Sequence, residues 1–325
     1  MKIAPRVIAA LVAWTALGFA GPASAQPFPH KSQPLTIVFP FTAGGMGDIL
    51  ARLISPRLGE SLGVPVVVEN KPGANGAIGL GGVSRARPDG HTIAVVPMST
   101  LVINPWMYKN LPYDPKELTP ISQALSLPNV LVVHPSLPIT SVAGLIDHAK
   151  THPGKVSYAS QGNGSSGHLM GELFNQSTKA DLIHIPYKGG AQAHASLLAG
   201  EVQVMFENIG VVLPHIKAGK LRALAVSTAE PAEAMPELPP ISATVPGFDA
   251  AIWFAFVGPP GMPKAVVDTL NAHLVKAMKA PDVVTAMHER GVKVLASDPA
   301  VLKNQITLDL ARWGKVVKDA GIEIQ

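Results

Sequence analysis

The sequence predicts an α/β fold, because two observations agree. Short apolar runs of strand length alternate with amphipathic helical patterns over residues 35–96, and the alternation restarts after residue 120. The strands are apolar on both faces, which is typical of a parallel sheet covered by helices. With 325 residues the chain is long enough for about two such units. We therefore expect two α/β units with largely parallel sheets.

The elements follow in order along the chain. In the first unit, strands are predicted at 35–39, 64–68 and 92–96, with helices at 46–62 and 75–87. A loop-rich stretch at 97–120 separates the units. In the second unit, strands are predicted at 130–133, 156–160, 182–186, 202–206 and 221–226, with helices at 142–151, 165–177, 191–199 and 211–218. A proline-rich segment follows at 230–246, and then a strand at 252–257. Two more helices are predicted: the first begins at Pro263, and the second begins at Asp298 and Pro299.

The first 25 residues have the pattern of an export signal. Lys2 and Arg6 form a basic start, an apolar run follows, and Ala23, Ser24 and Ala25 provide a small-residue cleavage site. The apolar run is too short for a membrane-spanning helix. We therefore expect cleavage after Ala25 and a periplasmic mature protein.

Composition excludes several function classes. The chain holds 26 Lys and Arg against 22 Asp and Glu, and the basic residues are scattered without interleaved aromatics, which argues against nucleic-acid binding. It has no Cys, which excludes disulfides, thiol catalysis and Cys-ligated zinc. No metal or cofactor site is predicted.

Two segments share one design: an apolar strand, a loop with three glycines and an amphipathic helix. The first loop holds Gly44, Gly45 and Gly47, and the second holds Gly162, Gly164 and Gly167. Glycine permits positive φ, and the first N–H groups of a helix attract anions. One such anion-binding site in each unit suggests a ligand cleft between the two units. The alternative is that these turns only connect strand to helix. We expect the anion-binding sites to depend on glycine conformations, so substitutions of Gly45 and Gly164 should weaken binding.

Other interpretations of the same loops remain. The second loop matches G-x-G-x-x-G, but Asp181 precedes the next strand rather than closing it, which disfavours a dinucleotide site. His168 is either a hydrogen-bond donor to a ligand or a packed residue of the first helical turn. Asp48 either meets a ligand amine or stabilises its own helix start. Lys188 is either a ligand contact or a solvated surface residue.

The motifs resemble those of the Bug-type periplasmic solute-binding proteins, the receptor subunits of tripartite tricarboxylate transporters. The resemblance covers the whole mature chain. Its motifs are residues 39–48 with Ala51 and Arg52, residues 69–73 with Gly76 and Gly79, and residues 87–92, 158–160, 162–168, 186–189, 205–208 and 213–220.

The resemblance implies a two-lobed periplasmic binding protein fold, type II-like, with a central ligand cleft and two interlobe crossings. Lobe 1 would comprise residues 26–127 and 248–325, and lobe 2 residues 128–247. The function implied is that of a receptor, not an enzyme, that binds a small carboxylate (a di- or tricarboxylate, an amino acid or an aromatic acid) and delivers it to a membrane permease. We expect a monomer that acts without a cofactor.

The resemblance also implies the ligand contacts, which lie on loops. Gly47 departs from the family pattern, in which a hydroxyl residue is frequent, and residues 97–101 replace a usual glycine and histidine pattern. The implied contacts are Thr42, Ala43, Gly44, Gly45, Met46, Gly47 and Asp48, then Ser99 and Thr100, then Gly162, Asn163, Gly164, Ser165, Ser166 and His168, and finally Tyr187, Lys188 and Gly189.

Two competing functions stay open. An exported hydrolase or isomerase would use His168 with Ser165 or Ser166, although the sequence places no orienting carboxylate nearby. A periplasmic sensor would have the same fold and present the bound ligand to a signalling partner. The identity of the carboxylate is not predicted.

Overall fold

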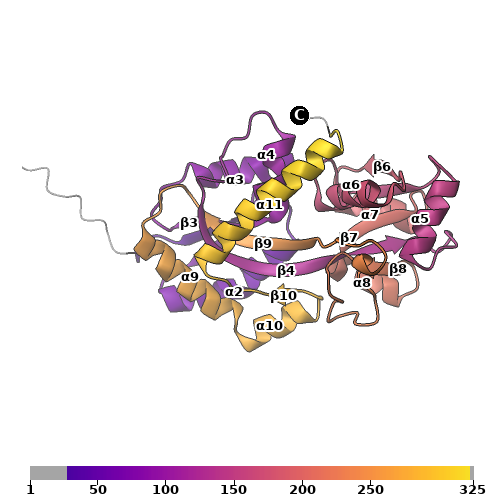
Figure 1. Cartoon of the computed structure of the whole chain (residues 1–325). Coiled ribbons are helices and arrows are strands. Elements are labelled where there is room, and N and C mark those ends of the chain that lie inside the picture. The colour runs from indigo at the N-terminus through magenta and orange to yellow at the C-terminus, as the bar shows by residue number, and fades with distance from the viewer. Residues whose placement is uncertain (1–27, 323–325) are drawn as a thin grey trace, which may run out of the picture.

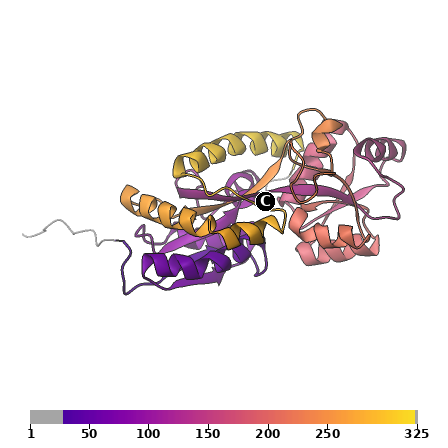
Figure 2. The same ribbon diagram turned by 90° about the horizontal axis from the view of Figure 1, so that it is seen from below.

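The protein folds into two α/β lobes that lie side by side (Figures 1 and 2). The computed structural model describes residues 28–322, so the predicted export signal lies outside the described residues. No helix within that range is long and apolar enough to cross a membrane. The α/β class predicted from the sequence is confirmed.

Lobe 1 is built on the first βαβαβ unit and the C-terminal part of the chain. Its elements are β1 (Leu35–Phe39), α2 (Met46–Leu62), β2 (Val66–Asn70), α3 (Ala77–Ser84), β3 (Thr92–Pro97), α4 (Asn104–Met107), β9 (Ala251–Gly258), α9 (Lys264–Met278), α10 (Pro281–His288), β10 (Lys293–Val294) and α11 (Pro299–Asp319).

Lobe 2 is formed by the middle of the chain. Its elements are α5 (Val142–Thr151), β5 (Ser157–Ser160), α6 (Ser166–Thr178), β6 (Ile183–Pro186), α7 (Gly190–Ala199), β7 (Val204–Asn208), α8 (Ile209–Lys217) and β8 (Arg222–Val226). Every strand and helix predicted in this unit after residue 133 is present, with bounds that differ by at most two residues, whereas the strand predicted at 130–133 is the end of a much longer one.

One long strand, β4 (Thr119–Val133), connects the lobes. Its first part pairs with β9 and β10 of lobe 1, and its last five residues, from Asn129, pair with β7 and β8 of lobe 2. The order of the main sheet is β2-β1-β3-β9-β4-β7-β5-β6. The outer strand pairs are parallel, whereas every pair that includes β4 or β9 is antiparallel. The sheet is therefore mixed rather than largely parallel.

The loop-rich stretch predicted at 97–120 contains two helical turns. Residues Ser99–Ile103 form one turn, and α4 follows directly, with Pro105 at a first-turn position where proline is tolerated. These turns are buried against α11, where the indole nitrogen of Trp106 donates to the carbonyl oxygen of Leu310 at 3.0 Å. The prediction of a loop-rich stretch agrees with residues 108–118, which form no helix or strand, but was wrong for 99–107, because short helices have too few residues to show a periodicity.

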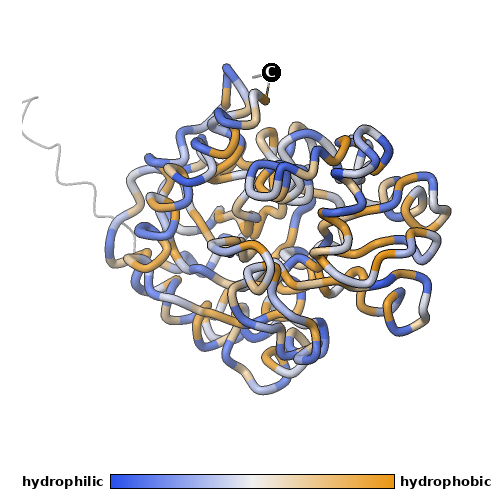
Figure 3. The backbone as a smooth tube through the Cα atoms, turned by 45° about the vertical axis from the view of Figure 1, so that its right-hand side comes forward, coloured by the Kyte–Doolittle hydropathy of each residue, from blue (hydrophilic) through white to orange (hydrophobic). Residues whose placement is uncertain are grey.

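Apolar strands form the interior of both lobes, and hydrophilic residues concentrate at the outer turns (Figure 3). A second crossing of the chain joins the lobes beside β4. The hydroxyl of Ser227 accepts from the N–H of Asn129 at 3.0 Å and donates to the carbonyl of Ala250 at 2.6 Å. The main-chain N–H of Ser227 also donates to the carbonyl of Asn129, and its carbonyl accepts from the N–H of Ala250, each at 2.8 Å. The two crossings are thus hydrogen-bonded to each other at one buried point.

Candidate ligand-binding cleft

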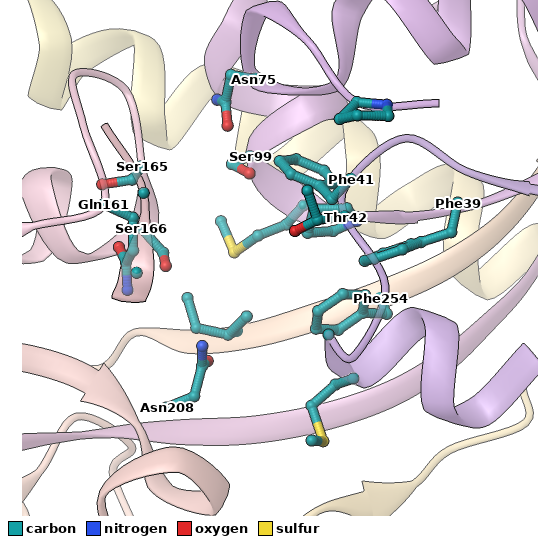
Figure 4. A pocket seen from close by; sticks show the side chains of 18 of the residues that line it. Phe39, Phe41, Thr42, Asn75, Ser99, Gln161, Ser165, Ser166, Asn208 and Phe254 are labelled. Atoms are coloured by element: carbon teal, nitrogen blue, oxygen red, sulfur yellow. The ribbon is translucent and has the colours of Figure 1, made fainter. Parts of the chain in front are cut away.

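A cleft of about 490 Å³ lies between the two lobes (Figure 4). Lobe 1 contributes the loop after β1, the turns around Pro72 and Asn75, and the start of the Ser99 turn. Lobe 2 contributes the loop before α6, the loop before α7, and the end of β7. The cleft therefore lies at the carboxyl ends of parallel strands of both lobes, where open α/β sheets bind ligands.

The first glycine loop turns tightly at Gly44, whose φ is +93°, a conformation that favours glycine. The N–H of Gly44 donates to Asp48 Oδ2 at 2.9 Å, while Asp48 Oδ1 accepts from Arg52 and Asn70. Burial alone would raise the pKa of Asp48, but these hydrogen bonds and the Arg52 charge outweigh it, so the pKa is lowered. Asp48 is buried and does not line the cleft. Of its two interpretations, the structure favours stabilisation of its own helix start.

Gly45 does not have the glycine-specific backbone conformation predicted for it. It precedes α2 with φ −73° and ψ 161°, an extended backbone open to any residue. What limits this position is space, since a Cβ atom here would lie 3.0 Å from Phe39 Cζ. The conformational requirement belongs to Gly44.

The second glycine loop meets the expectation more closely. Gly162 and Gly164 have φ of +125° and +76°. Ser165 caps α6, because its hydroxyl accepts from the N–H of His168. The cap leaves the N–H groups of Ser166 and Gly167, at the first two helical positions, without a helical partner. Ser165 and Ser166 line the cleft, so an unneutralised helix start lies at its edge.

His168 supports this loop from below instead of facing the cleft. Its Nδ1 accepts from the N–H of Gly164 at 3.1 Å, and its ring stacks on that of His184 with centroids 3.9 Å apart. Burial lowers the pKa of His168 to about 4. Burial, with the charge of His168, lowers the pKa of His184 to about 3. The structure favours the packed interpretation of His168.

Two residues below the stack complete this polar cluster. The hydroxyl of Tyr158 donates to Glu172 Oε1 at 2.6 Å, and Glu172 Oε1 lies 3.9 Å from His168 Nε2. The hydroxyl of Ser165 bonds the main chain of His168 rather than its ring. This arrangement therefore gives neither Ser165 nor Ser166 a hydrogen bond to a histidine ring. The serine that does bond the stack is Ser160, whose hydroxyl lies 2.7 Å from His184 Nε2, and it is fully buried and does not line the cleft.

A buried carboxylate orients two amides at the lobe 2 side of the cleft. Glu207 is 1% exposed, and its Oε2 contacts Gln161 Nε2 and His194 Nε2. Its Oε1 accepts from both the main-chain and the side-chain nitrogen of Asn208. The side-chain oxygens of Gln161 and Asn208 have no hydrogen-bond partner within the described residues. Both residues line the cleft, so these amides are available to a ligand or to water.

Asn75 reaches across the cleft from lobe 1. Its side-chain amide donates to Asn104 Oδ1 at 2.8 Å and to the carbonyl of Gly164 in lobe 2 at 3.3 Å. Its own carbonyl accepts from Thr100 and Asn104. Thr100 thus supports the site without lining it.

The predicted contact residues divide into two groups. Those that line the cleft are Thr42, Gly44, Gly45, Met46, Ser99, Asn163, Ser165, Ser166, Lys188 and Gly189. Those that lie beside or beneath it are Ala43, Gly47, Asp48, Thr100, Gly162, Gly164, His168 and Tyr187.

Most of the apolar residues that line the cleft were not predicted from the sequence. Phe39 and Phe41 belong to the motif 39–48 and Phe254 to the strand predicted at 252–257, but none of them was predicted to contact a ligand. Asn208 is the last residue of the motif 205–208, and Asn75 lies between the motif 69–73 and Gly76, so the resemblance was the available signal for both. The other lining residues are Pro72, Pro97, Met98, Tyr108, Gln161, Gly190, Val211 and Ile252.

Two α/β lobes joined by two crossings, with a cleft lined from both, define a periplasmic-binding-protein-type solute receptor. The sequence profile of the tripartite tricarboxylate transporter family receptor matches residues 50–322. The chain belongs to this family. Among its relatives is the protein BugT of Bordetella pertussis, 35% identical over 95% of each chain. A protein from the tcbD-tcbE intergenic region of Pseudomonas sp. strain P51 is 37% identical over 88% of this chain and 86% of its own.

Solved structures agree with this assignment. Rpa4515 of R. palustris, with adipate, is 35% identical and superposes with a TM-score of 0.84 over 92% of this chain and 100% of its own. The periplasmic binding protein BugD is 33% identical, with a TM-score of 0.80 over 90% and 99%. MatC of Rhodopseudomonas palustris, with malate, is 29% identical, with a TM-score of 0.79 over 88% and 99%. The predicted family and two-lobed fold are confirmed.

Proposed function

We propose that this receptor binds a small carboxylate in the interlobe cleft and delivers it to the membrane permease of a tripartite transporter. The observation behind the proposal is the charge of the cleft. Lys188 is the one charged residue that lines it within the described residues, and no carboxylate does. The start of α6 and the hydroxyls of Ser165 and Ser166 add hydrogen-bond donors for an anion. The relatives solved with adipate and malate support the same ligand class.

We propose residues 26–127 with 248–325 as lobe 1 and residues 128–247 as lobe 2. The change of partner strands along β4 between Pro128 and Asn129 supports the first boundary. The hydrogen bonds that join Ser227 and Ala250 support a second crossing near residue 248. Closure would be a rotation about these crossings.

The ligand contacts that we propose are the predicted loop residues. Those that line the cleft would touch the ligand, and those beneath it, such as Gly164 and His168, would position them. We propose that the protein acts as a monomer without a cofactor, since one chain provides both sides of the cleft. Light scattering after size exclusion tests the monomer.

We propose that the chain is exported and cleaved after Ala25. The basic start, the short apolar run and the small-residue site support this, and the periplasmic family agrees with it. Mass spectrometry of the native protein should find a chain that begins at Gln26. A membrane-retained chain that keeps residues 1–25 would overturn the proposal.

Ligand-dependent stabilisation tests the proposed function directly. A carboxylate at 100 times its dissociation constant should add about 2.7 kcal/mol to the free energy of unfolding. Its amide should not, because the helix start and the hydroxyls lose their charged acceptor. Equal stabilisation by acid and amide would contradict the proposal. The ligand should be recovered chemically unchanged; multiple turnovers that Ser165→Ala abolishes would instead indicate the hydrolase or isomerase.

A further inference from the structure

The ring of Phe39 occupies the space that any side chain at position 47 would need. A Cβ atom on Gly47 would lie 2.7 Å from Phe39 Cε2 and 3.2 Å from Phe254 Cδ1. Real Cβ atoms do not approach neighbours as closely as 2.7 Å, so a larger residue at position 47 would displace the ring. Glycine at this position of α2 therefore admits an aromatic ring to the cleft.

Phe39 belongs to an aromatic wall, which we define as Phe39, Phe41 and Phe254. The centroids of Phe39 and Phe41 are 5.5 Å apart, and all three residues line the cleft. In Figure 4 the three rings lie on one side of the cavity, while Gln161, Ser165 and Ser166 lie on the other. A carboxylate against the aromatic wall would lose its water without a compensating partner, whereas an apolar group would gain from burial there.

Among the helices that begin at the cleft, α2 and α6 differ in the charge of their starts. The start of α2 already holds the carboxylate of Asp48, which accepts the N–H of Gly44. The first turn of α6 holds no acidic residue, and Lys188 lies at the same side of the cleft. The carboxylate of Glu207 also lies in lobe 2, but it does not line the cleft, and its oxygens are bonded by Gln161, His194 and Asn208. A ligand carboxylate is therefore attracted to the start of α6 and faces an already neutralised helix start in lobe 1.

We propose that the receptor selects ligands with a single carboxylate and an apolar, ring-like body. The carboxylate lies at Ser165 and Ser166, the body packs on the aromatic wall, and Phe39 with Gly47 determines this specificity. The inference rests on the proposed function and narrows its ligand class.

Calorimetric titration of the mature protein with four probes tests the selection. Benzoate and cyclohexanecarboxylate represent the proposed class, and malate and adipate are diacids of similar size. The two monoacids should bind at least tenfold more tightly than either diacid. Tighter binding of a diacid would overturn the inference and leave the proposed function standing. If no probe and no other carboxylate stabilises the protein, the proposed function itself fails.

Substitutions at the ring test the role of Phe39 and Gly47. Gly47→Ser should push the ring aside and weaken benzoate binding by tenfold or more. The matched control is Gly82→Ser, at an exposed helical glycine with no atom near its Cβ position. The double variant Phe39→Val with Gly47→Ser restores space and adds a hydroxyl, so its preference should shift towards malate. If Gly47→Ser does not fold, Phe39→Leu replaces it and should weaken benzoate but not malate. A Gly47→Ser or Phe39→Leu variant that binds benzoate as the control does would overturn the inference.

Discussion

The side-chain nitrogen of Asn75 lies 3.3 Å from the carbonyl oxygen of Gly164, so lobe 1 donates a hydrogen bond directly to the glycine loop of lobe 2. Asn75 is held for this contact by Asn104 and Thr100, and its φ of +47° is one that few residues other than glycine and asparagine adopt. The contact joins the lobes next to Ser165, at the helix start that we assign to the carboxylate.

Asn75→Gly should therefore speed ligand release. Glycine keeps the positive φ and removes the side chain with its two hydrogen bonds, of which the one to Asn104 lies within lobe 1 and the one to Gly164 joins the lobes. The loss between the lobes is about one hydrogen bond, roughly 1 kcal/mol or a fivefold faster dissociation. Stopped-flow dissociation measures it, and Asn110→Gly in an exposed loop is the control. An unchanged dissociation rate would show that the contact does not hold the lobes together.

The stacked histidines predict a pH dependence of stability. The pKa values of His168 and His184 lie below the ordinary 6.5, at about 4 and about 3. The unfolded chain therefore takes up protons before the folded one as the pH falls. Stability is fully present above pH 6.5 and declines towards pH 4.

Urea unfolding between pH 7 and pH 4 checks this decline. Each histidine contributes up to about 1.4 kcal/mol per pH unit to the slope of the free energy of unfolding against pH. His184→Gln should therefore reduce that slope by up to this amount. His152→Gln, at an exposed position, should leave the slope unchanged. An equal slope in all three proteins would contradict the assignment.

Backbone geometry should matter more for binding than the charge of Lys188. Gly164 has φ +76°, and its N–H bonds His168, so Gly164→Val would strain the loop by about 1 to 3 kcal/mol and displace Ser165. Lys188 is exposed, and Lys188→Gln should weaken binding by at most about 1 kcal/mol. Calorimetry compares the two variants, with circular dichroism to confirm folding. If Lys188→Gln abolished binding and Gly164→Val did not, side-chain charge would be the main determinant.

Ser227→Ala should destabilise the connection between the lobes. The substitution leaves the buried N–H of Asn129 without its hydroxyl acceptor and removes the donor to the carbonyl of Ala250. We expect a loss of about 1 to 3 kcal/mol in the free energy of unfolding, measured by urea denaturation. Thr228→Ala, whose hydroxyl bond is exposed, should lose less than about 0.5 kcal/mol. Equal losses in the two variants would show that the buried hydrogen bonds of Ser227 stabilise the protein no more than an exposed one does.

The sequence predicted the elements of both lobes because strand and helix patterns are local. It missed most of β4, since Pro120 and Pro128 interrupt the strand pattern and only residues 130–133 remained recognisable. Phe39 and Gly47 were each visible, but their contact was not, because it depends on how α2 lies against β1. The same holds for Asn75 and Gly164, which are 89 residues apart and meet only in the folded protein.

The passage of β4 through both lobes also limits how one lobe can turn against the other. Peptide planes on either side of Asn129 belong to different ladders, so a rotation would twist β4 at this residue. The second crossing is hydrogen-bonded to the same residue through Ser227 and would have to turn with it. The axis of any such rotation would therefore pass near Asn129, where both connections are hydrogen-bonded to each other.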